Sequence, residues 1–149
     1  MIELRIPWLP PSANNAYFNL PRGGRTLTNK GKKFKRETAA HLVQTYPTQL
    51  KFFEPNRPYG LAIQFVFENM LNKTYPEKAA TRYKKVDTSN RLKLLEDVLA
   101  EVANTDDSQH LFLLIDKYDG APEATKIWAW DLEREGTLPD DVISLFRCL

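Results

Sequence analysis

Apolar residues recur at every second position in some segments of this chain and at every third or fourth position in others. This change of spacing along the sequence restricts the fold more than any other feature. Period-two patterns bounded by turn residues predict four strands, at residues 2–8, 59–67, 109–117 and 125–131. Helical spacing predicts three helices, from Thr28 or Asn29 to about Tyr46, over residues 89–103, and from Thr137 to the end. Because strands and helices are mixed without a strict repeat, we expect one α+β domain over residues 1–149, a mixed sheet with helices packed on it.

Length and composition suit a soluble domain. The 149 residues are 42% hydrophobic, which provides enough apolar surface to offset the entropy of ordering and argues against disorder. The longest apolar run, Leu111–Ile115, is far too short to cross a bilayer, and the first residues lack the layout of a signal peptide. The single cysteine, Cys148, cannot form an internal disulfide. We therefore expect a cytoplasmic protein without membrane contact.

The charges are unevenly distributed along the chain. Residues 1–93 hold 17 Lys and Arg against 6 Asp and Glu, a net charge of +11. Residues 94–149 hold 4 against 13, a net charge of −9. A basic half joined to an acidic half favours a surface for a polyanion such as nucleic acid, with a metal site or a partner surface beside it. The alternative is that folding mixes the two halves and the asymmetry disappears.

The basic residues gather at the start of the first helix and in residues 69–86, an aperiodic segment that we interpret as a loop. We expect phosphate contacts from Arg22, Arg25, Lys30, Lys32, Lys33, Lys35, Arg36, Lys73, Lys78, Arg82, Lys84 and Lys85. Tyr75 and Tyr83 in the loop either stack on an unpaired base or pack locally.

The helix over residues 89–103 has two different sides. At 100° per residue, the apolar side that should be buried consists of Leu92, Leu95, Val98, Leu99 and Val102. The polar side consists of Asn90, Lys93, Asp97 and Glu101. These polar side chains form either part of a reactive site or a solvated face with a Lys93–Asp97 ion pair of little energetic value.

Acidic residues flank this helix, with Asp87 before it and Asp106-Asp107 after it. Two or three carboxylates from element ends can hold Mg²⁺ or Mn²⁺, which would activate water for attack on phosphorus. Lys93 would then neutralise charge in the transition state. The alternatives are that Asp87 is an ordinary N-cap and that Asp106-Asp107 is an exposed turn.

The chain resembles the RusA family of Holliday junction resolvases over most of its length. The most specific likeness is the central pattern, Asp87-x-Ser89-Asn90-x-x-Lys93-x-x-x-Asp97, followed by Asp106-Asp107-x-Gln109 and a strand bearing Lys117. The N-terminal likeness consists of Pro7-Trp8, Pro10-Pro11-Ser12, Asn14, Asn15, Tyr17, Gly24-Arg25-Thr26 and Gly31-x-x-Phe34-x-x-Glu37.

This resemblance implies a homodimeric, Mg²⁺-dependent endodeoxyribonuclease that resolves four-way junctions in DNA recombination and repair, often encoded by prophages. It implies that Asp87 and Asp107 bind the metal, that Lys93 is the essential lysine, and that Asn90 lies beside the metal. Mn²⁺ is the alternative ion.

One position departs from the family's pattern, because Ser89 stands where the family typically has a second aspartate. A hydroxyl binds Mg²⁺ far more weakly than a carboxylate does. Either another acid compensates, with Asp97 the first candidate and Glu68 and Asp106 next, or the chain is a weakened or inactive junction-binding protein.

The length of the helix over residues 89–103 also determines how far apart its flanking acidic residues lie. The helix should be roughly 20 Å long, with Asp87 and Asp107 at its two ends. Two copies arranged antiparallel about a two-fold axis would bring Asp87 of one beside Asp107 of the other. We therefore expect metal sites shared across a homodimer.

Overall fold

The sheet is built around one strand that is covered on both faces. The computed structural model describes the backbone of residues 1–147, and the side chains of these residues except 107 and 145–147. All nine residues of β4 (Tyr59–Phe67) are buried. β4 pairs in parallel with β5 (His110–Asp119) and antiparallel with β6 (Ala124–Asp131), and β6 pairs with β1 (Ile2–Ile6). The strand order β1-β6-β4-β5 confirms the expected mixed sheet.

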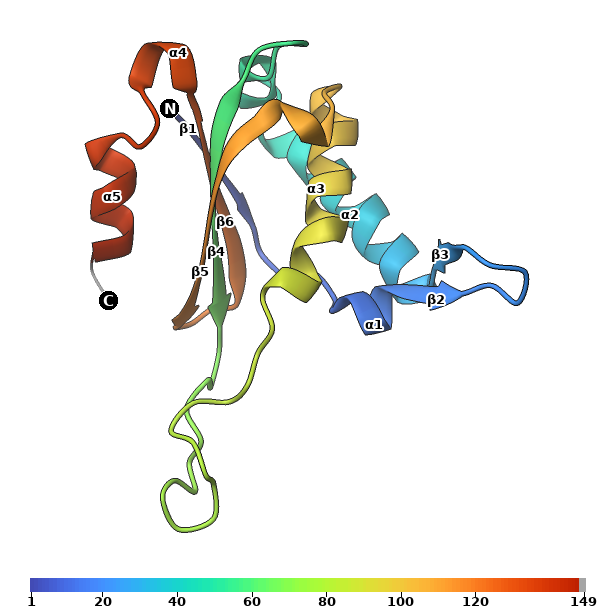
Figure 1. The fold of residues 1–149 in the computed structure, drawn as a ribbon, viewed down its shortest axis with the longest axis vertical. Coiled ribbons are helices and arrows are strands. Elements are labelled where there is room, and N and C mark those ends of the chain that lie inside the picture. Colours follow the sequence, from blue (N-terminus) through green and yellow to red (C-terminus); the bar gives the residue numbers. More distant parts are fainter. Residues whose placement is uncertain (148–149) are drawn as a thin grey trace.

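Helices cover the two faces of the sheet unequally. α2 (Asn29–Thr45) and α3 (Ser89–Ala103) lie on one face, and the shorter α5 (Asp140–Arg147) lies on the other (Figure 1). The larger core lies under α2 and α3, and the smaller one contains Trp128, Trp130 and Val142. The α+β prediction is therefore confirmed.

The two long helices begin close to where the sequence predicted. The Thr28 hydroxyl caps α2 by accepting a hydrogen bond from the Gly31 amide at 3.1 Å. The buried stripe of α3 is partly different from the prediction: Leu94 and Ala103 are buried, whereas Leu92 and Val102 are only partly buried. The stripe is rotated because α3 packs against α2 as well as against the sheet.

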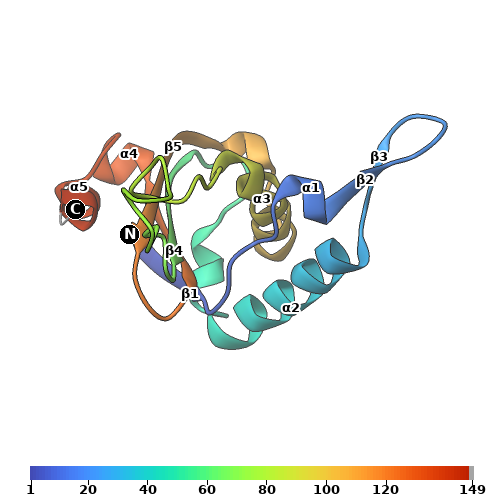
Figure 2. The same cartoon turned by 90° about the horizontal axis from the view of Figure 1, so that it is seen from below.

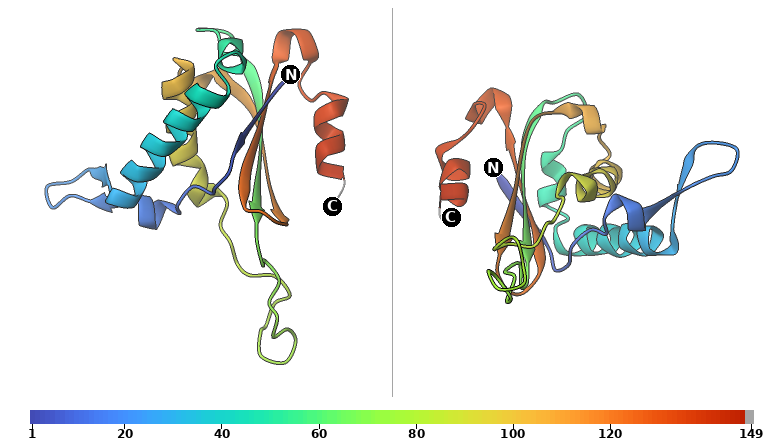
Figure 3. Two further views of the ribbon diagram at one scale, coloured as in Figure 1. Left: turned by 180° about the vertical axis from the view of Figure 1, so that it is seen from behind. Right: turned by 60° about the horizontal axis from the view of Figure 1, so that its bottom comes forward.

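The region up to Gly24, predicted as a loop, is more structured than expected. It contains α1 (Ala13–Ala16) and β2 (Tyr17–Asn19), and β2 forms a hairpin with β3 (Arg25–Leu27), which follows directly after this region. Gly23 and Gly24 adopt φ of 87° and 88°, which the turn between such short strands requires. The hairpin projects away from the sheet in both views of Figure 3. Three-residue strands are too short to show a periodic pattern, which explains the wrong prediction.

Residues 69–86 form a loop, as the sequence predicted. This basic loop extends below the sheet in Figure 1 and contains one isolated bridge, between Leu71 and Tyr83. Viewed from below, the β2–β3 hairpin lies on the opposite side of the molecule from α5 (Figure 2).

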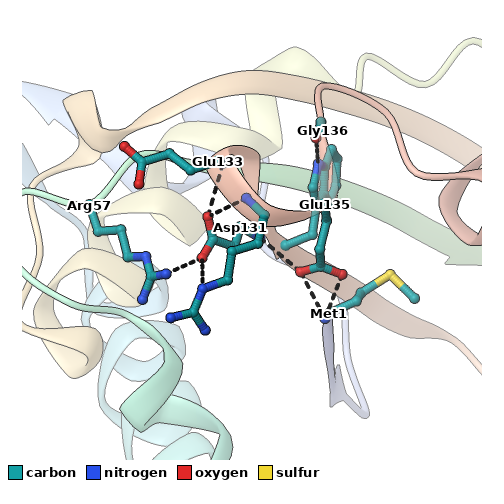
Figure 4. Close-up of polar contacts among 8 residues, drawn as sticks. Met1, Arg57, Asp131, Glu133, Glu135 and Gly136 are labelled. Atoms are coloured by element: carbon teal, nitrogen blue, oxygen red, sulfur yellow. Dashed lines mark hydrogen bonds and ion pairs between the residues drawn. The ribbon is translucent and has the colours of Figure 1, made fainter.

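The C-terminal part adds a short helix that was not predicted, α4 (Leu132–Glu135), before α5. The Asp131 carboxylate caps α4 and pairs with Arg57, and the amino group of Met1 lies 2.8 Å from a Glu135 carboxylate oxygen (Figure 4). Cys148 and the predicted end of the last helix lie outside the described residues. Among the described residues, no helix combines the length and apolarity needed to cross a membrane.

Candidate active site

The candidate site lies at the first turn of α3. The basic loop leads directly into this turn, and α1 with its hairpin lies on the other side of it (Figure 1). Thr88, the residue next to the helix, makes no capping hydrogen bond through its side chain. Instead, Asp87 Oδ1 accepts from the Asn90 amide at 3.3 Å. Asp87 therefore caps α3, as one of the two interpretations of the sequence proposed. The capping hydrogen bond fixes the position of its carboxylate.

Both oxygens of the Asp87 carboxylate accept side-chain hydrogen bonds. The Ser89 hydroxyl donates to Oδ1 at 2.6 Å, and Asn90 Nδ2 donates to Oδ2 at 2.6 Å. The Ser89 hydrogen bond, followed by the Asn90 amide, lowers the pKa of Asp87 below its ordinary value of 3.8. The exposed carboxylate is therefore negatively charged at neutral pH.

One turn further along α3, Lys93 and Asp97 form the predicted pair, with Lys93 Nζ 2.9 Å from Asp97 Oδ1. The Tyr17 hydroxyl, from β2, donates to Asp97 Oδ2 at 3.1 Å. Burial, and then the charge of Asp97, raises the pKa of Tyr17. The Arg25 guanidinium lies 5.6 Å from the centre of the Tyr17 ring. Asp97 therefore forms an ion pair with Lys93 through one carboxylate oxygen and accepts a hydrogen bond from the hairpin through the other.

Sequence reasoning did not assign this role to Tyr17. Tyr17 and Asp97 are 80 residues apart, and no local pattern links them. The one available signal was that Tyr17 belongs to the N-terminal likeness to the family.

The end of β5 also contacts the site. Lys117 Nζ donates to the carbonyl oxygen of Val86 at 3.0 Å, immediately before Asp87. Its neighbour Asp116 accepts a hydrogen bond from Gln64 Nε2 at 3.2 Å. The C-terminal end of β5 is therefore tied to the residue that precedes the candidate metal ligand.

Asp106 and Asp107 lie at the other end of α3. Asp106 Oδ1 accepts from the Ser108 amide at 2.8 Å and caps η2 (Asp107–Gln109), which agrees with a turn role for Asp106. The side chain of Asp107 is outside the described part of the structure. Because the 15 residues of α3 span about 22 Å, Asp87 and Asp107 are not brought together within one chain.

The described residues of one chain provide donors of the right type for Mg²⁺ but too few of them. Carboxylate, hydroxyl and amide oxygens are hard ligands, and Asp87, Ser89 and Asn90 carry all three kinds. Within the described residues, however, no three His, Cys, Asp or Glu side chains are grouped to hold a metal. Asp97 already binds Lys93 and Tyr17, and Glu68 lies just beyond β4. A Mg²⁺ site at Asp87 would therefore need a further carboxylate from outside this group of residues.

The predicted phosphate-binding residues are distributed over three segments of the chain. Arg22 and Arg25 lie in the hairpin, five residues lie on α2, and the rest lie in the basic loop. Lys35 pairs with Glu101 across α2 and α3 at 2.6 Å, so it also joins the two helices. Arg82 lies over the ring of Tyr83, with 5.9 Å to the ring centre.

Comparison with known proteins gives one finding. A family model described as Endodeoxyribonuclease RusA matches residues 7–127, which include the hairpin, the basic loop, α3 and β5. No curated protein matches the chain.

Proposed function

This chain belongs to the RusA family of endodeoxyribonucleases, and from that premise we propose that it is a Mg²⁺-dependent endonuclease that resolves Holliday junctions in DNA recombination and repair. The observation that supports this most strongly is the Asp87 carboxylate, which is exposed, ionised and held at the point where the basic loop leads into α3. A phosphodiester bound by the basic loop would lie near an acid able to hold a divalent ion.

In this proposal, Asp87 binds the ion with Asp107 of the partner subunit, and Asn90 and Ser89 orient the Asp87 carboxylate. A bound Mg²⁺ would supply an activated water and neutralise the leaving oxygen. Lys93 holds its ammonium group toward the phosphate while Asp97 and Tyr17 restrict its position. Asp106 supports the backbone of Asp107 by capping the turn.

A homodimer fits the substrate. Because a four-way junction has two-fold symmetry, two identical sites could cut opposite strands in a paired reaction. We also propose a cytoplasmic location and, as the family resemblance implies, a prophage origin.

A second candidate function is junction binding with weak or no cleavage. The observation that favours it is the Ser89 hydroxyl, which occupies an oxygen of Asp87 at 2.6 Å where the family typically has another carboxylate. The site then carries one negative charge fewer, which weakens its attraction for Mg²⁺.

A cleavage assay with a synthetic immobile four-way junction and Mg²⁺ separates the two functions. We expect symmetric nicks from the wild type and a loss of about 100-fold or more for Asp87→Asn, because the ion would lose a charged ligand. Glu3→Gln is the matched control, since Glu3 is exposed on the edge strand β1, outside the candidate site.

Ser89→Asp is the informative third variant. It should increase cleavage if metal affinity limits the wild type. Binding without nicks by the wild type, together with cleavage by Ser89→Asp, would support the second function. Cleavage by Asp87→Asn at the wild-type rate would contradict the proposed site.

A further inference from the structure

A cavity of about 470 Å³ lies beside the first turn of α3, between α2 and the chain that joins β1 to α1. Its apolar wall contains Trp8, Pro10 and Phe34, and Trp8 is only partly buried. Its charged side chains come from α2, from Arg91 on α3 and from the turn between β5 and β6. A volume of this size is typical of sites that bind small organic groups.

The apolar wall is held by hydrogen bonds to the elements around it. Trp8 Nε1 donates to the Thr38 hydroxyl of α2 at 2.9 Å, and the Thr125 hydroxyl of β6 donates to the carbonyl oxygen of Trp8 at 2.9 Å. From α3, Arg91 Nη1 donates to the carbonyl oxygen of Pro10. The cavity is therefore already formed before a ligand enters, which lowers the cost of binding.

Three cationic side chains line the cavity, those of Lys30, Lys33 and Arg91. Neither lysine forms an ion pair with a side chain that the structure describes. Because α2 has no acidic residue in its first turn, Lys30 adds charge to the positive end of the helix dipole, which a bound anion would offset. Burial lowers the pKa of Arg91, and its Nε is buried with no hydrogen-bond partner among the described residues. These three groups favour a ligand with a negative charge.

Two carboxylates, of Glu37 and Glu123, also line the cavity, so three cations and two anions leave a net charge of +1. A small free anion would gain little from so low a charge. A nucleotide suits the whole wall better, because its phosphate is attracted by the cations and its base can pack on the aromatic and proline rings. The N–H groups of the base can donate to the carboxylates.

We propose that this cavity binds one unpaired nucleotide of branched DNA, with the base against Trp8 and the phosphate beside Lys30 and Lys33. The proposal rests on the proposed function, which makes branched DNA the substrate, and it adds how a branch point is distinguished from a duplex. Bases of an intact duplex are paired and stacked, whereas a base at a branch point is released at lower cost. Arg91 and Asp87 are four residues apart at the start of α3, so the cavity and the candidate metal ligand lie at the same end of this helix.

Tryptophan fluorescence of the full chain tests the position of the base, with a single-stranded oligothymidylate as the probe. Trp128 and Trp130 are 3% and 0% exposed and belong to the smaller core on the other face of the sheet, so quenching by the probe reports Trp8. We expect the probe to quench the wild type, and Trp8→Phe to abolish the quenching in a protein whose fold circular dichroism checks. Binding of the probe without quenching in the wild type would contradict the proposed cavity.

Two charge reversals at neighbouring residues separate this cavity from the general attraction of DNA. Lys32→Glu and Lys33→Glu change the net charge equally, and both residues are exposed on α2, but Lys33 lines the cavity and Lys32 does not. Lys32→Glu should weaken the binding of the oligothymidylate and of duplex DNA by a similar factor. Lys33→Glu should weaken binding of the oligothymidylate at least about fivefold more than binding of the duplex. Equal losses for the two kinds of DNA in Lys33→Glu would overturn the proposal.

Cleavage of the four-way junction is measured separately on the same samples. A wild type that cuts junctions, but whose fluorescence the bound oligothymidylate does not quench, would contradict the cavity alone. Quenching of Trp8 together with the selective loss in Lys33→Glu, in a protein that does not cut junctions, would support the cavity and contradict the proposed cleavage alone.

Discussion

At the scale of single residues, the candidate site depends on three neighbouring side chains. Asp87 was identified as a flank and possible cap of the helix, Asn90 as part of its polar side, and Ser89 from the resemblance to the family. The capping role of Asp87 was among the interpretations of the sequence, whereas the side-chain hydrogen bonds at 2.6 Å from Ser89 and Asn90 were not predicted. The Tyr17–Asp97 hydrogen bond was not predictable, since it depends on where the hairpin lies relative to α3.

The Ser89 hydroxyl provides a residue-scale prediction. Ser89→Ala removes the largest cause of the lowered pKa of Asp87, so the pKa should rise toward 3.8. A lowered pKa in the folded state stabilises the protein above the unfolded-state pKa, and this stabilisation is lost as pH falls through the folded-state value. Protonation of Asp87 at acid pH should therefore cost Ser89→Ala less folding stability than it costs the wild type.

Carboxyl-detected NMR titration of Asp87 measures the shift directly. Ser144→Ala, on α5, removes a different hydroxyl and should leave the titration of Asp87 unchanged. An Asp87 pKa equal in Ser89→Ala and in the wild type would show that the Ser89 hydroxyl does not hold the carboxylate.

At the scale of elements, long periodic segments were predicted well and short ones were not. α2, α3 and β4 match their predicted ranges because the spacing of apolar residues in their sequences extends over nine residues or more. The hairpin and α4 were missed because they contain three or four residues per element. Their conformations depend on glycine turns and on caps such as Asp131 rather than on periodicity.

The contact between α1 and α2 gives an element-scale prediction. A Cβ on Gly31 would lie 2.5 Å from the carbonyl oxygen of Ala16, a backbone atom that cannot easily move. Gly31→Ala gains up to about 1 kcal/mol in helix propensity, but overpacking costs about 1–3 kcal/mol. We expect a net loss of stability in urea unfolding and a displaced hairpin.

Lys32→Ala is the control, because Lys32 is the next residue of α2 and is exposed. It should leave the free energy of unfolding nearly unchanged. A Gly31→Ala protein that is more stable than the wild type would show that α1 does not pack closely on α2.

At the scale of the whole molecule, the basic loop and the acidic pair Asp106-Asp107 lie at opposite ends of α3. The loop leads directly into the first turn of the helix, while the acidic pair lies about 22 Å away at the far end. The sequence predicted that separation from helix length alone. The sequence could not predict that β5 is an edge strand, because strand order depends on pairing between distant segments.

The most direct test of a site shared between two copies mixes two inactive chains. If Asp87 of one copy acts with Asp107 of the other, then a dimer of one Asp87→Asn chain and one Asp107→Asn chain keeps one intact site. Random pairing makes half of the dimers mixed, so about a quarter of the wild-type sites should be restored.

The measurement is the nicking of a four-way junction by the two variants, refolded together and compared with each variant alone. We expect no nicks from either variant alone and clear nicks from the mixture. A mixture that forms mixed dimers but remains as inactive as its components would contradict the shared site.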